Sequence, residues 1–141
     1  MLEHSSDVML SVDKDVTLKG AYSKNPAKKS KGLFILLHGW EGSEKSTYIL
    51  RTGKFLFTQG YDVFRLNLRD HGDTHDLNEE PFNGSLLGET YEAVYQGAKL
   101  SGKLPVYLCG FSLGGNFCLR IALKSSNSKK KDSKSYTYFC V

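Results

Sequence analysis

The amino-acid sequence predicts an α/β fold in which helices flank a mostly parallel sheet. Two observations support this fold class. Short apolar runs alternate along the chain with segments of helical periodicity, and glycine marks several of the boundaries between them. The helical segments are also long enough to serve as right-handed crossovers, which join neighbouring strands in parallel.

Six segments have the pattern of strands. They are residues 7–13, 16–23, 32–39, 61–70, 104–110 and 135–141. Only a polar turn separates the first two, so we expect them to pair antiparallel at one edge of the sheet. The third, GLFILLHG, is apolar on both faces, which is typical of a strand in the middle of a parallel sheet.

Helices are expected near residues 47–59, 85–101 and 113–124. Gly60 and Gly102 follow the first two and are good helix stops. The second helix carries an apolar stripe at spacings of four, three and four residues. That stripe consists of Leu87, Tyr91, Val94 and Ala98.

The composition is that of one soluble globular domain covering residues 1–141, with 40% hydrophobic and 24% charged residues. Most of the net charge of +4 comes from a lysine-rich loop at 125–135, before the terminal strand 136–141. No aromatic residues interleave these lysines, as they would on a stacking platform for single-stranded nucleic acid. We therefore interpret the loop as solvated and expect no nucleic-acid partner.

Targeting and metal-binding signals are not apparent in the sequence. The N-terminus lacks the pattern of a signal peptide, and the longest strongly apolar run, Leu33–Leu37, is far shorter than the ~20 residues of a membrane span. Three cysteines (Cys109, Cys118 and Cys140) are too few for a disulfide framework, and no Cys/His spacing suggests a metal site. A cytoplasmic protein without metal or cofactor is expected.

The sharpest chemical feature is Gly110-Phe111-Ser112-Leu113-Gly114, a G-x-S-x-G pattern. It begins at the end of an apolar strand and runs directly into a helix, which is the context of a nucleophile elbow. In such a turn the serine adopts a strained backbone conformation with positive φ, and side chains at the two glycines would collide with neighbouring elements. The backbone N–H of Leu113 at the helix start can bind an oxyanion.

A second motif, His38-Gly39-Trp40-Glu41-Gly42, follows the central apolar strand. Gly39 allows the loop to turn close to the serine. His38 belongs to a buried strand end, so we expect it to order the loop through hydrogen bonds and not to serve as catalytic base.

A third segment, residues 67–76 (NLRDHGDTHD), is rich in acids and histidines. It could supply a triad if Asp70 or Asp73 paired with His71 or His75 beside the elbow serine, or it could hold a metal. We favour a loop ordered by hydrogen bonds, because Asn, Asp and Gly commonly stabilise turns in this way.

With HGWEGS, NLRDHGDTHDLNE and GFSLGGN in this order, residues 10–125 resemble the α/β-hydrolase superfamily, and within it the YheT-like predicted esterases. The resemblance implies Ser112 as nucleophile and the backbone N–H groups of Trp40 and Leu113 as the oxyanion hole. It also implies a small acyl or ester substrate, and a loop at 69–76 that shapes the site without taking part in the chemistry.

The residues after Ser112 depart from the family pattern. The superfamily places an acid and then a histidine after the nucleophile. Here the only later acid is Asp132, in the lysine-rich loop, and all four histidines precede Ser112. No triad acid or histidine is identified, and the sequence resembles a hydrolase domain truncated after the nucleophile helix and one further strand.

Three hypotheses follow from this departure. The chain is a fragment of a serine hydrolase, completed by a C-terminal half, and the same fold could also support acyl transfer to an alcohol. Alternatively, it is a catalytically inactive, hydrolase-like binding module or a decaying gene product. A third hypothesis is a short active enzyme that uses His71 or His75 as base.

Overall fold

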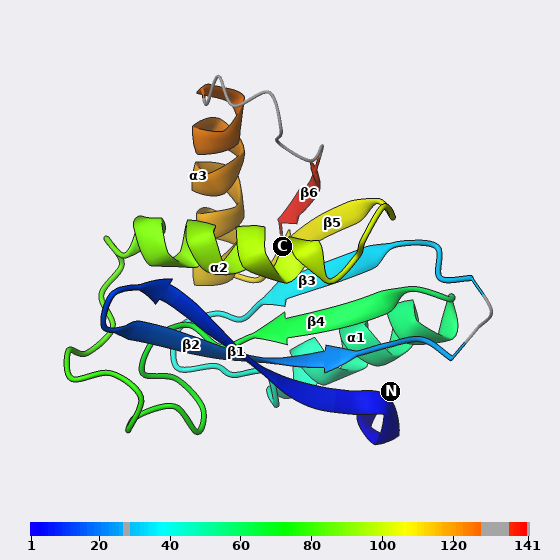
Figure 1. The fold of residues 1–141 in the computed structure, drawn as a ribbon, viewed down its shortest axis with the longest axis horizontal. Coiled ribbons are helices and arrows are strands. Elements are labelled where there is room, and N and C mark those ends of the chain that lie inside the picture. The colour runs from blue at the N-terminus through cyan, green and yellow to red at the C-terminus, as the bar shows by residue number, and fades with distance from the viewer. Residues whose placement is uncertain (27–28, 128–135, 141) are drawn as a thin grey trace.

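The computed structural model describes residues 1–26, 29–127 and 136–140, and its strands form one six-stranded sheet (Figure 1). The strands are β1 (Ser5–Asp13), β2 (Val16–Ser23), β3 (Leu33–Leu37), β4 (Asp62–Leu66), β5 (Val106–Gly110) and β6 (Tyr136–Cys140). The helices are a short 3-10 turn at Leu2–His4, α1 (Thr47–Thr58), α2 (Leu87–Lys99) and α3 (Leu113–Asn127).

The strand order is β1-β2-β4-β3-β5-β6. Strands β4, β3, β5 and β6 run parallel to one another, whereas β2 pairs antiparallel with both β4 and β1 at one edge of the sheet. The predicted fold class and the predicted edge pairing are therefore confirmed. The carboxyl ends of β3, β4 and β5 meet at one edge of the sheet, where the three sequence motifs begin.

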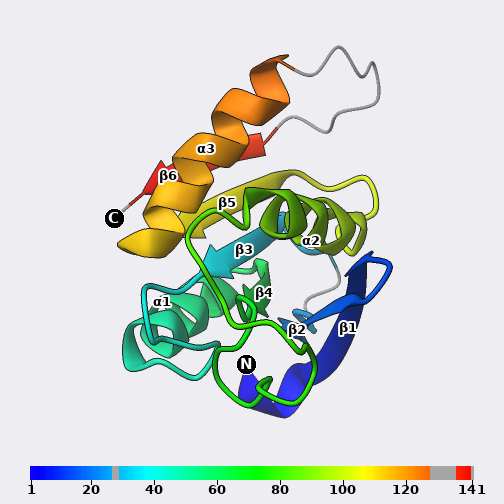
Figure 2. The same cartoon turned by 90° about the vertical axis from the view of Figure 1, so that its left-hand side faces the viewer.

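Helices cover both faces of the sheet, with α2 and α3 on one face and α1 on the other (Figures 1 and 2). The side chains of β3 show why this strand is apolar throughout. Ile35 and Leu37 pack in the core beneath α2 and α3, whereas Leu36 packs with Ile49 of α1. Successive residues of a strand point to opposite faces, so a strand covered on both sides must be apolar at every position.

Three predicted strands are shorter in the structure. The strand predicted at 32–39 spans Leu33–Leu37, and for the other two the reason can be identified. The strand predicted at 61–70 ends at Leu66, because the N–H of Leu68 donates to the ring of His38 and not to a neighbouring strand. The strand predicted at 104–110 begins at Val106, after Pro105, which has no N–H to donate.

The helix after the elbow is longer than predicted, so the lysine-rich loop does not begin at residue 125. Helix α3 continues to Asn127, and in its last turn the hydroxyl of Ser126 donates to the carbonyl oxygen of Leu123 at 2.9 Å. Residues 128–135, which hold the lysines, and Val141 lie outside the described part of the chain. Within that part, none of the helices has the length and apolar character of a membrane span.

Candidate active site

Ser112 lies at the turn between β5 and α3 with φ of 51°, as predicted for an elbow serine. Its side chain is exposed at the carboxyl end of the sheet. The turn is closed by two hydrogen bonds: the N–H of Gly114 donates to Phe111 O at 2.9 Å, and the N–H of Asn116 donates to Ser112 O at 3.0 Å. A left-handed backbone conformation at a non-glycine residue costs free energy, so the surrounding structure must hold it.

The two glycines of the motif are required by close backbone contacts. A Cβ at Gly110 would lie 2.2 Å from the carbonyl oxygen of Gly114, at the start of α3. A Cβ at Gly114 would lie 2.4 Å from the carbonyl oxygen of Leu37, at the end of β3. Both distances are shorter than van der Waals contact. A side chain at Gly110 would therefore collide with the helix, and one at Gly114 with the strand, as expected.

The loop after β3 passes directly beside Ser112. A Cβ at Gly39 would lie 3.4 Å from Ser112 Cβ and 3.3 Å from Phe111 O. An open pocket of about 440 Å³ is lined by this loop and the elbow, through Gly39, Trp40, Tyr48, Phe111 and Ser112. Ser112 therefore faces a space in which a small ligand could contact both loops.

The N–H groups of Trp40 and Leu113 are the two candidate oxyanion donors. In the described part of the chain, neither donates a hydrogen bond to a protein acceptor. Leu113 is the first residue of α3, where the helix leaves N–H groups unpaired and its dipole favours negative charge. The arrangement can therefore offer backbone donors to an anion near Ser112.

His38 is fully buried and fixes the loops after β3 and β4 to one another. Its Nε2 accepts the N–H of Leu68 at 3.0 Å, so the proton lies on Nδ1, which donates to Gly39 O at 2.7 Å. Burial lowers the pKa of His38 to about 4. The prediction that His38 orders the loop is confirmed, and both of its ring nitrogens are occupied.

The buried neutral state of His38 should make the stability of the domain depend on pH. Between pH 6.5 and about 4 the unfolded chain binds a proton at His38 and the folded chain does not, so stability falls as the pH falls. Above pH 6.5 the neutral His38 makes its full contribution to the free energy of unfolding. Roughly 3 kcal/mol of this contribution is lost as the pH falls to about 4. A His38→Gln variant has no group that titrates at this position. The difference in free energy of unfolding between wild type and variant, measured in urea titrations, should therefore shrink from pH 7 to pH 4. A constant gap, or an NMR titration of His38 near pH 6.5, would contradict this assignment.

The loop predicted at 70–76 is ordered by hydrogen bonds, as expected. His71 Nδ1 contacts Arg69 O at 2.7 Å, the hydroxyl of Thr74 donates to His71 O at 2.7 Å, and His75 Nδ1 contacts Asp70 Oδ1 at 2.5 Å. Within residues 1–26 and 29–127 no cluster of metal-binding side chains is found.

The two histidines of this loop are not joined to Ser112. His71 and His75 line a separate pocket of about 340 Å³, together with Glu41 and Asp70. Neither histidine makes a hydrogen bond to Ser112 in the described part of the chain. The structure therefore does not assemble the triad that the density of acids and histidines suggested.

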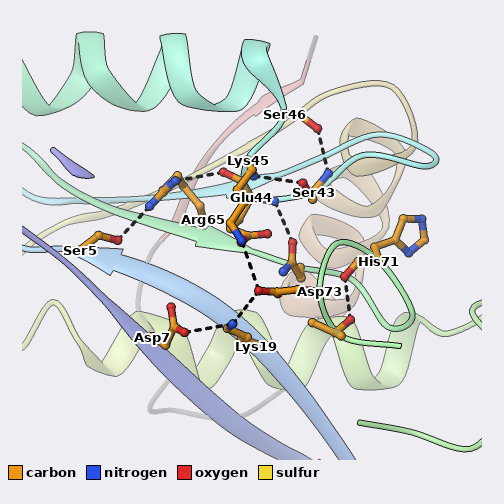
Figure 3. A network of polar contacts seen from close by, with 12 residues as sticks. Ser5, Asp7, Lys19, Ser43, Glu44, Lys45, Ser46, Arg65, His71 and Asp73 are labelled. Carbon is orange, nitrogen blue, oxygen red and sulfur yellow. Dashed lines mark hydrogen bonds and ion pairs between the residues drawn. The ribbon is translucent and has the colours of Figure 1, made fainter. Parts of the chain in front are cut away.

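Sequence reasoning missed the polar network that fastens this loop to the sheet (Figure 3). The carboxylate of Asp73 accepts hydrogen bonds from Lys19 Nζ at 3.1 Å and Lys45 Nζ at 3.2 Å, and these bonds lower its pKa. The buried guanidinium of Arg65 donates to Glu44 O at 3.0 Å and to Ser5 Oγ at 2.9 Å. The signal in the sequence was Arg65, a charged residue in a strand whose residues are all buried.

A second ion pair joins the loop to α2. Arg69 Nε donates to Glu89 Oε2 at 3.0 Å, and Arg69 Nη2 donates to the same oxygen at 2.5 Å. Both side chains are buried, with exposed fractions of 8% and 6%. The loops around the site are thus held by contacts to β2, β4, α2 and each other.

Comparison with known sequences identifies the fold family. Residues 32–131 match the sequence model of the family described as the alpha/beta hydrolase fold. The chain belongs to the α/β-hydrolase family. No curated protein sequence matches it.

Solved structures with this fold include named esterases. The chain is similar to the esterase Pf2001 of Pyrococcus furiosus, with 24% identity and a TM-score of 0.67 over 82% of this chain and 45% of that one. It is similar to Est1E of Butyrivibrio proteoclasticus, solved with ferulic acid bound, with 20% identity and a TM-score of 0.73 over 85% of this chain and 48% of that one. The chain thus spans about half the length of both esterases.

A third similar structure is XC6422 of Xanthomonas campestris, described as an α/β serine hydrolase without a lid. The identity is 17% and the TM-score is 0.72, over 97% of this chain and 70% of that one. At these identities the likeness shows the fold alone, in agreement with the family match.

Proposed function

We propose that this chain supplies the nucleophile and oxyanion hole of a serine hydrolase that acts on an ester or related acyl bond. The observation that carries the proposal is the exposed Ser112 at φ 51°, in a strand-to-helix turn beside an open pocket. The Oγ of Ser112 attacks the acyl carbon, and the backbone N–H groups of Trp40 and Leu113 stabilise the oxyanion. The bond to the alcohol then breaks, and water later releases the acid from the acyl-enzyme.

The reaction requires a base that takes the Ser112 proton and returns it to the leaving alcohol. His38 cannot be this base, because its Nε2 accepts the N–H of Leu68. His71 and His75 line another pocket, and His4 lies in the N-terminal 3-10 turn. We therefore propose that the triad acid and histidine come from outside these 141 residues, in a complementing C-terminal half. The coverage of about half of two esterases supports this proposal.

Three further features belong to the same proposal. The substrate is a small ester or acyl compound, by analogy with the structurally similar proteins named as esterases. Acyl transfer to an alcohol would use the same intermediate. The chain is assigned to the YheT-like subgroup, acts in the cytoplasm and does not bind nucleic acid, on the sequence features given above.

A second candidate function is a catalytically inactive, hydrolase-like binding module, or the product of a decaying gene. The observation that favours it is that none of the described residues offers Ser112 a base. Such a module would keep the pocket beside Ser112 but would not form an acyl-enzyme.

Slow acylation of Ser112 in the isolated chain distinguishes these two functions. Deacylation also needs a base, so an acetyl group transferred from p-nitrophenyl acetate should accumulate on Ser112 without turnover. After tryptic digestion, Ser112 is the only serine of residues 104–120, and the exposed Ser85 is the only serine of residues 70–99. Peptide mass spectrometry can therefore compare the two serines in one sample.

We expect Ser112 to be acetylated on the order of 10²-fold faster than Ser85 in the folded chain, because two backbone donors stabilise the oxyanion. In urea the two rates should become similar. Equal rates in the folded chain would exclude the nucleophile assignment and favour the binding module.

A further inference from the structure

The hydroxyl of Tyr48 lies between the two loops that flank Ser112. Tyr48 is in the first turn of α1, and its oxygen accepts the N–H of Gly39 at 2.9 Å. The next residue, Ile49, is 1% exposed and packs with Leu36 of β3, so a rigid element holds the tyrosine in place. A helix therefore fixes the position of a loop amide beside the nucleophile.

The turn at residues 39–42 closes around this hydroxyl. The N–H of Gly42 donates to Gly39 O at 3.1 Å, and Glu41 has φ of 54°. A Cβ at Gly42 would lie 2.6 Å from the Tyr48 hydroxyl oxygen, so any side chain there would displace it. The turn is thus shaped to the tyrosine as well as to the serine.

Tyr48 also contacts the elbow itself. Its ring lies 5.0 Å from the ring of Phe111, the residue before Ser112. Gly39 lies between Tyr48 and Ser112. A Cβ added at Gly39 would lie 3.4 Å from Ser112 Cβ and 3.6 Å from the Tyr48 hydroxyl oxygen. A movement of the turn away from Tyr48 would therefore change its distance from Ser112.

We propose that Tyr48 is a positioning residue of the oxyanion hole. By accepting the N–H of Gly39, its hydroxyl fixes the turn that carries the next N–H, that of Trp40, toward Ser112. The Gly39 N–H is occupied by this bond, which leaves Trp40 as the donor of the loop. The inference rests on the function proposed above and adds to it the residue that orients one donor.

The variant Tyr48→Phe tests this role because it keeps the ring contact with Phe111 and removes only the hydroxyl. Tyr95→Phe on α2 is the matched control, since the two tyrosines are equally exposed, at 38%. The experiment uses the whole chain and measures acetylation of Ser112 over a range of p-nitrophenyl acetate concentrations. Amide hydrogen exchange of Gly39 is followed in the same proteins by NMR.

In Tyr48→Phe, we expect Gly39 to exchange at least about 10-fold faster, because its hydrogen bond is lost. The limiting rate of Ser112 acetylation should fall about 10-fold, less than the ~10²–10³ lost when a donor is removed outright. The half-saturating ester concentration should stay unchanged, and Tyr95→Phe should match wild type in all three measurements.

Two results would overturn the inference, and they are distinguishable. If Gly39 exchange rises or stays constant while Ser112 acetylation keeps the wild-type limiting rate, Tyr48 does not position the donor, and the proposed function stands. If wild-type Ser112 is acetylated no faster than Ser85, the proposed function fails and the role of Tyr48 fails with it.

Discussion

Replacing Gly114 by alanine is expected to destabilise the domain by about 3 kcal/mol and to lower its melting temperature by roughly 10 °C. The added Cβ would lie 2.4 Å from Leu37 O and 2.5 Å from His38 O, both backbone atoms at the end of the central strand. Leu37 O also accepts the N–H of Phe111 at 3.1 Å, so it cannot move without breaking the elbow. Thermal unfolding followed by circular dichroism measures the effect.

The matched control for this prediction is Gly88→Ala, in the first turn of α2. A Cβ at Gly88 meets no atom within 4 Å, so the same substitution should be neutral or stabilise the helix by about 0.5–1 kcal/mol. Nearly equal melting temperatures for Gly114→Ala and wild type would show that the tight contact between elbow and strand is not required. Loss of Ser112 acetylation in the same variant would link the contact to the site.

The sequence predicted the strand-to-helix turn at Ser112 because the information for it is local. Two glycines flank a serine at the boundary between an apolar strand and a helical segment, and few backbone conformations satisfy that pattern. The positive φ of Ser112 was therefore expected. Glu41 and Asp70 also have positive φ, in the loops after β3 and β4, and nothing in the local sequence predicted them.

The contacts between distant segments could not be predicted. The bond from Gly39 to Tyr48 depends on how α1 packs on the sheet, and the pair of Arg69 and Glu89 depends on the position of α2. The periodicity of a helix shows which face is buried, but not which loop atom a side chain at its end will reach. The sequence left a triad from the 67–76 segment open while favouring an ordered loop, and the separate pockets of Ser112 and His71 agree with the loop.

We propose that this chain supplies the nucleophile half of a hydrolase site. We expect negligible turnover of p-nitrophenyl esters by the chain alone, because no described histidine is joined to Ser112. A second polypeptide that carries the later strands with an acid and a histidine should restore turnover when the two assemble. Such a polypeptide can be sought in the reading frame directly downstream.

In that assembled enzyme, Ser112→Ala should reduce kcat by roughly 10⁶-fold, the scale of losing a nucleophilic serine from a complete triad. Arg51→Ala, on the exposed side of α1, serves as the control and should leave turnover unchanged. The role of Ser112 as nucleophile is therefore tested most directly by ester turnover. Turnover is measured for the chain with and without the second half, in wild type and in Ser112→Ala. We expect turnover only when wild-type Ser112 and the second half are present together. Substantial turnover by the isolated chain, lost in His71→Ala or His75→Ala, would contradict it.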